Sequence, residues 1–321
     1  MPAFYTHYTF GKDVKKKSKL KNIDDNLYNI FNQSFDSFYF YNFYFPFYGK
    51  KVRKIAYIGH RKNVNKYFIN IIKYMKEHDC ANDSKTRAFL YGSLNHYILD
   101  STIHPYIFYL TGVYNNEDPL SFKYNGLHSE AEFSIDAYLY KKKHNLPYYK
   151  KNITKSIFLK PIFNDKLYSC IDKVFYKTFD IENGGKNYIK SIRDYRFTYK
   201  YFYSDKYGIK KRLLSILDKI TGKKVINLKY HTTNYKDINK KYLNLDRNSW
   251  RHPSLKDDKK NDSFFDLYEE GLIKSNLIID EIEKYFNDLS SIDLVKSLIQ
   301  NNSYVTGLDI NKNKKMKYFK Y

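Results

Sequence analysis

The sequence predicts an all-α fold, a multi-helix bundle, and three observations support this prediction. In several segments apolar residues recur every three or four positions, which is the spacing of one face of an α-helix. Aromatic runs such as residues 38–48 do not alternate with polar residues, so they lack the pattern of a half-buried strand. The 321 residues would suffice for one large domain or two smaller ones. No internal repeat and no linker rich in Gly, Ser or Pro divides them, which favours one domain.

Four helices are predicted in chain order. The first covers residues 62–75, and the second covers residues 83–109, beginning at an Asp or Ser cap and ending near Gly112. The third covers residues 129–143, and the fourth covers residues 263–289. The apolar side chains that define the first and fourth helices are Phe68, Ile69, Ile72 and Met75, then Phe264, Leu267, Tyr268, Leu272, Leu277, Ile278 and Ile282.

The composition narrows the classes of function. The 57 Lys and Arg residues against 34 Asp and Glu residues give a formal net charge of +23, which predicts attraction to a polyanion, either nucleic acid or an anionic membrane surface. The alternative explanation of the high charge and aromatic content is codon bias, because AT-rich codons favour Lys, Tyr, Asn and Ile. Two widely spaced cysteines exclude a disulfide framework and a thiolate zinc cluster. No signal-peptide run and no stretch of transmembrane length is present, so a cytoplasmic protein is expected.

The distribution of histidine is the most informative feature of the sequence. Six of the nine histidines lie within the first 128 residues. His96, Asp100 and His104 follow one another at intervals of four, which places them on one face of a helix. His128 and Glu132 repeat this spacing on the next predicted helix. Imidazole and carboxylate groups that project from one stripe are the ligands that a zinc or dinuclear metal site requires.

A single His and Asp four residues apart is more often a hydrogen bond on a helix surface. Here the two pairs lie among apolar neighbours such as Leu94, Ile98, Leu99 and Ile103, so folding would bury several ionisable groups together. Buried groups of this kind need a partner or a metal ion. The combination therefore favours a metal site over the surface hydrogen bond.

The aromatic run at residues 38–48 allows two interpretations. Basic residues follow it directly, so its rings could hold a quaternary ammonium group, a lipid interface or unpaired bases. The alternative, favoured for most of these rings, is core packing exaggerated by codon bias. Rings close to Asp36 are expected to line a substrate pocket, and the candidates are Phe38, Tyr39 and Tyr41.

Taken in order, these segments resemble the bacterial zinc-dependent phospholipase C family, in its branch without a signal peptide. The opening MPAFYTHYTFGKDV supplies His7, SFDSFYFY supplies Asp36, and GHRKNVNKYF supplies His60. LYGSLNHYILDSTIHPYI is close to the central motif of the family, and LHSEAEFSID supplies its His and Glu element. LNLDRNSWRHPS resembles a late segment of the family, so the resemblance spans about residues 1–285.

The resemblance implies an all-α bundle with two or three zinc ions between its helices. Two ligand sets are implied, Asp36, His60, His96 and Asp100 for one ion and His104, His128 and Glu132 for a second. His7 with Asp100 would hold a third ion, which in secreted relatives also uses the amino terminus of the processed chain. This chain begins Met-Pro, and Ser34 and Phe35 precede Asp36 where the family has Gly-Pro.

Clustered divalent ions lower the pKa of bound water and neutralise phosphate oxygens, so the predicted reaction is phosphodiester hydrolysis. Asp36 is the candidate for orienting or deprotonating the attacking water. The leading hypothesis is a phospholipase C-like enzyme acting on a phospholipid headgroup. The alternatives are a single-strand nuclease of the same fold, and a non-catalytic basic protein that binds nucleic acid or a membrane. The predicted organisation is one domain over residues 1–300, with the metal site in 1–145, helical completion in 146–300 and a mobile basic tail in 301–321.

Overall fold

The computed structural model describes residues 4–18, 20–45, 47–146, 160–201, 209–221, 239–312 and 314–320. The first part of the chain forms α1 (Phe4–Ser18), α2 (Asp25–Phe31), η1 (Ser34–Phe40), α3 (Lys50–Gly59), α4 (Val64–Glu77), α5 (Ser84–Thr111), η2 (Pro119–Tyr124) and α6 (Leu127–His144). The later part forms α8 (Asp165–Phe179), α9 (Gly184–Tyr201), α10 (Ile209–Thr221), η6 (Lys240–Leu243), β1 (Trp250–Arg251), β2 (Lys259–Lys260), α11 (Phe264–Phe286), α12 (Ile292–Ile299) and η7 (Ile310–Lys312). The all-α prediction is confirmed.

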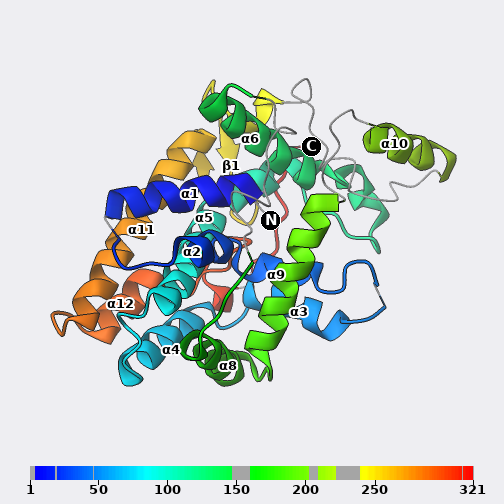
Figure 1. Ribbon diagram of the computed structural model, residues 1–321. Coiled ribbons are helices and arrows are strands. Elements are labelled where there is room, and N and C mark those ends of the chain that lie inside the picture. The colour runs from blue at the N-terminus through cyan, green and yellow to red at the C-terminus, as the bar shows by residue number, and fades with distance from the viewer. Residues whose placement is uncertain are drawn as a thin grey trace.

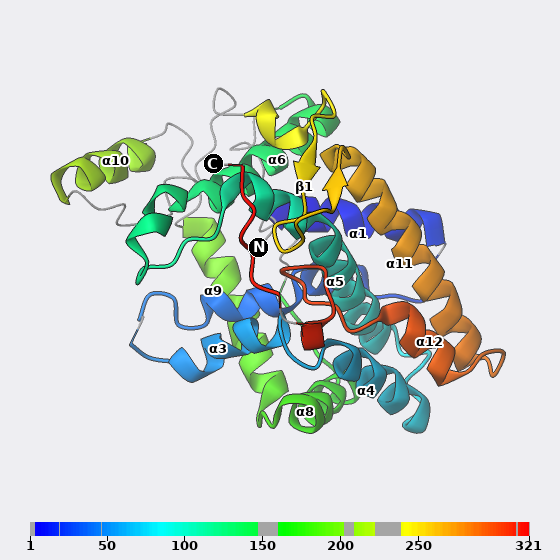
Figure 2. The same ribbon diagram turned by 180° about the vertical axis from the view of Figure 1, so that it is seen from behind.

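The long helix α5 is the centre of the bundle, and other helices pack around it (Figures 1 and 2). It begins at Asp83, whose side chain accepts a hydrogen bond from the backbone N–H of Thr86. It ends at Gly112, which adopts a φ of 63°. Most of its residues are buried, so the helix has no polar face and its His and Asp side chains lie inside the protein.

The four predicted helices correspond to α4, α5, α6 and α11, with ends that differ by a few residues from the expected ones. The start of α11 is fixed by a capping box in which Ser263 and Asp266 bond to each other's backbone N–H groups. Strands are almost absent from the described residues, as the all-α prediction requires. The one small sheet is an antiparallel pair in which Trp250 faces Lys260 and Arg251 faces Lys259.

Aromatic side chains fill much of the core. Phe35, Phe38, Tyr67, Phe175 and Tyr188 form one connected group between η1, α4, α8 and α9. These rings account for part of the high Tyr and Phe content, because large rings are used here where aliphatic residues usually pack. Within the described residues, no helix is long and apolar enough to cross a membrane.

The C-terminal segment differs from the predicted mobile tail. Tyr304 is buried, and its backbone N–H donates to the carbonyl of His60. Further along, Lys317 and Tyr318 donate backbone N–H groups to the carbonyl of Pro253, and Lys320 donates to that of Tyr109. The polar composition of this segment gave no sign that it packs on the bundle, because the contacts are made by backbone groups and by the buried ring of Tyr304.

Candidate metal centre

Five elements bring the predicted site residues together around one face of α5. His96, Asp100 and His104 occupy successive turns of α5, as their spacing predicted. The other five come from elements packed against that face: His7 from α1, Asp36 from η1, His60 from the C-terminal cap of α3, and His128 and Glu132 from α6. All of these residues are buried except His128, whose side chain is 24% exposed.

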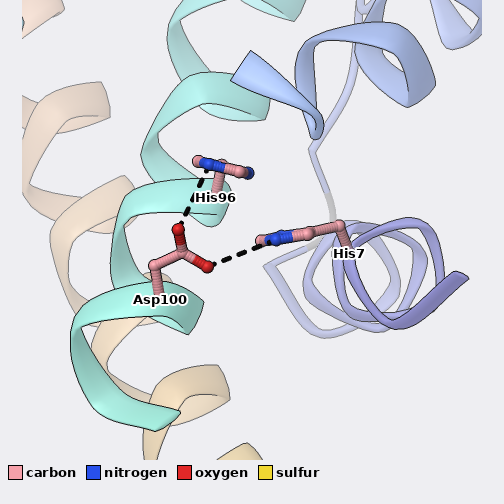
Figure 3. Close-up of side chains that lie close together, drawn as sticks. All are labelled: His7, His96 and Asp100. Atoms are coloured by element: carbon pink, nitrogen blue, oxygen red, sulfur yellow. Dashed lines mark ion pairs between the residues drawn. The ribbon is translucent and has the colours of Figure 1, made fainter. Parts of the chain in front are cut away.

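The first of three potential ligand groups contains His7, His96 and Asp100. Nε2 of His7 lies 3.3 Å from Oδ1 of Asp100, and Nε2 of His96 lies 3.3 Å from Oδ2 of the same carboxylate. The two imidazole rings are stacked, with their centroids 4.1 Å apart. Figure 3 shows the Asp100 carboxylate pointing towards both rings, one from α1 and one from α5.

The second group contains Asp36, His60 and His96. Oδ1 of Asp36 lies 3.2 Å from Nε2 of His60 and 3.9 Å from Nε2 of His96. The two Nε2 atoms are 3.4 Å apart, and that of His60 is 3.7 Å from Oδ2 of Asp100. His96 therefore belongs to both groups, and Asp100 lies next to each.

The third group contains His104, His128 and Glu132. Oε1 of Glu132 lies 2.8 Å from Nε2 of His128 and 3.7 Å from Nε2 of His104. Nδ1 of His104 is 3.8 Å from Oδ2 of Asp100, which connects this group to the other two. All eight predicted residues thus lie in one continuous cluster.

Backbone carbonyls orient three of the imidazoles. The Nδ1–H of His60 donates to the carbonyl of Ala56 at 2.6 Å, and that of His96 donates to Asn32 at 3.0 Å. The Nδ1–H of His104 donates to the carbonyl of Tyr304 at 2.7 Å. These bonds assign the proton to Nδ1, so each Nε2 presents a lone pair to the cluster. This is the arrangement that orients histidine ligands in metal sites.

The donor set fits a group of divalent cations. Oδ1 of Asp36 and both carboxylate oxygens of Asp100 are buried and accept no hydrogen bond of good geometry. They face imidazole nitrogens whose lone pairs point towards them, so acceptors oppose acceptors in a buried place. Such an arrangement is unfavourable unless a cation lies between the groups. Imidazole nitrogen and carboxylate oxygen are the ligands that zinc takes when thiolates are absent.

Burial sets the proton affinities of the cluster. It lowers the pKa of His96 to about 3, and it also lowers the pKa of His104 and of His128. Burial raises the pKa of Glu132 to about 7. For Asp100, burial alone would raise the pKa, but the imidazoles of His104, His96 and His7 outweigh it and the pKa is lowered. The imidazoles of His96, His104 and His128 are therefore held neutral, which is the form that binds metal.

The predicted substrate-contacting rings fall into two kinds of environment. Phe38 is fully buried, and its ring centroid lies 4.8 Å from that of Tyr188. Phe38 thus supports η1 from the core instead of lining a pocket, because its ring packs into the aromatic group with Phe175 and Tyr188. Tyr39 is half-buried with its ring 6.2 Å from that of His60. Tyr41 is half-buried with the ammonium of Lys190 5.1 Å from its ring centroid.

Sequence reasoning missed two residues that hold the centre in place. The buried carboxylate of Asp136 accepts hydrogen bonds from the backbone N–H of Tyr5 at 2.7 Å and of Thr6 at 2.8 Å. This anchors the positive end of α1 one residue before His7. Asp136 follows Glu132 at an interval of four, a signal that was open to detection. Tyr304, whose carbonyl fixes His104, had no such signal.

The fold and the site define a class of protein, an all-α bundle with a buried His and carboxylate centre suited to several divalent cations. The family model for zinc dependent phospholipase C matches residues 6–185, which is more than half of the 321 residues. The chain therefore belongs to the zinc-dependent phospholipase C family, and all eight cluster residues lie within the matched range. Membership supports zinc dependence and a phospholipase C-like function. No curated protein and no solved structure matches the chain.

Proposed function

We propose that this chain is a zinc-dependent phosphodiesterase that hydrolyses a phospholipid headgroup ester in the manner of a phospholipase C. The observation that carries the proposal is the buried cluster of five histidines and three carboxylates with its lone pairs turned inward. Without a bound cation, such an enclosed cluster destabilises the folded state, because buried acceptor atoms face one another. It becomes favourable when cations occupy it.

The proposed ligand sets follow the geometry. Asp36, His60, His96 and Asp100 would hold one zinc ion, and His104, His128 and Glu132 would hold a second. His7 would hold a third ion together with Asp100, whose Oδ1 faces His7 while its Oδ2 faces the other imidazoles. The two oxygens of Asp100 can therefore serve different ions. Bound zinc supplies Lewis-acid activation of water and neutralises the charge of the phosphodiester.

Asp36 is proposed to act on the attacking water. Oδ1 lies 3.2 Å from Nε2 of His60, and its buried position keeps bulk water from competing for that oxygen. Burial alone would raise the pKa of Asp36, but the imidazoles of His96 and His60 outweigh it and lower the pKa. The carboxylate is thus ionised at neutral pH, and it can orient a water molecule or accept its proton.

The experiment combines metal content with turnover of a soluble chromogenic phosphorylcholine ester. Protein purified without added zinc should contain two or three zinc ions per chain and hydrolyse the ester. His96→Ala should lose both zinc and activity. His78→Ala is the matched control, because His78 is exposed and belongs to none of the three ligand groups, and it should change neither. A wild-type protein that is purified without zinc and does not bind added zinc would overturn the proposal.

A second candidate, a single-strand nuclease, is favoured by the net charge of +23 and by a basic groove. The groove lies between α4, α12 and the C-terminal segment, and its lining includes Lys66, Lys73, Lys296 and Lys312. Cleavage of single-stranded DNA without turnover of the phosphorylcholine ester would favour the nuclease. Neither activity in a zinc-loaded protein would favour the third alternative, a basic binding protein.

A further inference from the structure

Two connections between elements of the metal cluster expose large apolar side chains. The first, residues 41–49, joins η1, which carries Asp36, to α3, which ends at His60. The second, residues 112–126, joins α5 to α6, which carries His128 and Glu132. In both ribbon views these connections lie towards the same end of the molecule, at the right of Figure 1 and the left of Figure 2.

The exposed side chains of these connections, with Tyr57 of α3, are called here the apolar rim. Phe47 is the extreme case with 93% of its surface exposed, and Leu120 follows with 83%. The members of the rim are Tyr44, Phe45, Phe47, Tyr48, Tyr57, Val113, Tyr114, Leu120 and Phe122. Exposed apolar groups gathered at one place indicate a binding surface, whereas single ones are ordinary.

Hydrogen bonds hold the described residues on both sides of the first connection. The guanidinium of Arg53 donates to the carbonyls of Tyr41 at 2.9 Å and Tyr48 at 2.7 Å, which closes the connection into a loop. The hydroxyl of Tyr44 and the backbone N–H of Asn42 both donate to the carboxylate of Asp194 in α9. The loop is therefore tied at both ends while Phe45 and Phe47 point outward.

Lysines follow the aromatic loop directly along the chain. Lys50, Lys51 and Lys54 are exposed on α3, immediately after the aromatic loop. The second connection carries Glu117 and Asp118 as well as Lys123, so the positive charge of the rim comes mainly from α3. Aromatic rings beside lysines match the interface of an anionic bilayer, where rings enter the headgroup region and ammonium groups meet phosphates.

Helix α10 lies towards the same end in both views (Figures 1 and 2). Ile209, Leu213, Ile216 and Ile220 occupy one face of it, at intervals of four, three and four residues. Their side chains are between 53% and 75% exposed. An amphipathic helix of this kind, with basic residues on its other faces, is typical of proteins that lie on a membrane surface.

We propose that the apolar rim and Lys50, Lys51 and Lys54 dock this protein on an anionic phospholipid surface, with the metal cluster facing the headgroups. The choice of a lipid rests on the proposed function. The alternative, single-stranded nucleic acid, fits the aromatic rings and the cations but not Val113 and Leu120, which have no face for stacking a base. Because η1 with Asp36 directly precedes the first connection and His128 directly follows the second, docking would place the cluster next to the membrane.

The test is sedimentation of the full chain with vesicles of phosphatidylcholine, with and without a quarter of phosphatidylglycerol. Wild type should bind the anionic vesicles and lose binding at high salt. Phe45→Ser with Phe47→Ser should weaken binding by roughly tenfold for each ring removed. The matched control is Leu277→Ser with Leu289→Ser, two exposed apolar residues outside the rim, and it should bind as wild type does.

The charge contribution is tested separately. Lys50→Gln, Lys51→Gln and Lys54→Gln together should weaken binding to anionic vesicles by roughly fivefold for each lysine. The same change at Lys173, Lys177 and Lys274, which are exposed on α8 and α11, alters the net charge equally and should have a much smaller effect. All variants should keep the thermal midpoint of wild type, since the substituted side chains are exposed.

The outcomes separate this proposal from the proposed function. Absence of vesicle binding in a protein that hydrolyses the soluble ester would overturn the docking surface and leave the enzyme. Vesicle binding that depends on the rim, in a protein without hydrolysis, would support the surface and overturn the enzyme. Binding of single-stranded DNA that Phe45→Ser with Phe47→Ser abolishes, without vesicle binding, would assign the rim to nucleic acid and overturn the proposal.

Discussion

Two parts of the metal centre differ in how far water reaches them. The enclosed part consists of His7, Asp36, His60, His96 and Asp100, all between 0% and 3% exposed. The open part consists of His104, His128 and Glu132, where the His128 side chain is 24% exposed. Asp100 touches both, since its Oδ2 lies 3.3 Å from His96 and 3.8 Å from His104. The enclosed part keeps its charged groups away from solvent, and the open part is the side of the cluster that solvent reaches.

The largest effect is expected where the two parts meet. Asp100→Asn keeps the size of the side chain but removes the charge that faces both parts. Zinc content should fall by at least two ions per chain. A residue that only orients a ligand would instead weaken metal affinity by roughly 10–100-fold. Elemental analysis of the purified protein measures this. If only one ion is lost, Asp100 serves a single ion and the two parts are independent.

The next prediction separates the roles of the two parts. Asp36→Asn in the enclosed part should lower kcat by about 10²–10⁴-fold, because the proposed base is lost while its neighbours can still hold metal. His128→Ala in the open part should instead release one zinc ion, and added zinc should partly restore activity. Steady-state kinetics with and without added zinc distinguish the two. Restoration of Asp36→Asn by zinc would show that Asp36 serves only as a ligand.

The pH dependence of the metal-free protein should combine two contributions of opposite sign, one from the imidazoles and one from Glu132. Burial lowers the pKa of His96 from 6.5 to about 3, so between these values the unfolded chain binds the proton and the folded chain does not. The free energy of unfolding therefore falls as the pH falls through this window. Glu132 opposes this, because its pKa is raised from 4.5 to about 7 and the folded chain binds more protons between these values.

Three imidazoles with lowered pKa values act against this one carboxyl group, so the net result should be loss of stability in acid. Urea unfolding of metal-free protein at pH values from 7 down to 4.5 measures it. Glu132→Gln removes the opposing contribution and should make the loss steeper in that range. A stability that rises as the pH falls would contradict the neutral imidazoles.

The smallest effect is expected outside the cluster. Asp136→Asn weakens the bonds that hold the start of α1, and it should lower the free energy of unfolding by about 1–3 kcal/mol. It should also weaken zinc binding at the enclosed part through His7, leaving the His104 and His128 side unchanged. Chemical unfolding and zinc titration of the same variant check both. Equal loss from both parts would mean that α1 supports the whole bundle, without a particular role for His7.

Most of the site residues that could be predicted from the sequence were found from their helical spacing. The stripe of α5 and the pair on α6 are local patterns, so their residues could be grouped without coordinates. The family resemblance added His7, Asp36 and His60, and the fold brings them to α5. The environment of Phe38 was not predictable, because the direction of one ring in a run of aromatics depends on which neighbours fill the core.

Contacts between distant segments could not be predicted either. The carbonyl that orients His96 belongs to Asn32, and the one that orients His104 belongs to Tyr304. Every residue has a backbone carbonyl, so the type of a residue does not indicate whether its carbonyl will orient a histidine. The buried ring of Tyr304 in a polar, basic segment shows the same limit.

The attachment of Tyr304 has a consequence for biosynthesis. All eight cluster residues have been translated by residue 132, yet the carbonyl that fixes His104 arrives about 170 residues later, with Tyr304. The same residue donates its backbone N–H to His60, so its arrival ties two separated ligands at once. Because the ribosome synthesises the chain from its amino end, the carbonyl that orients His104 becomes available only after helices α1 to α12 have been translated.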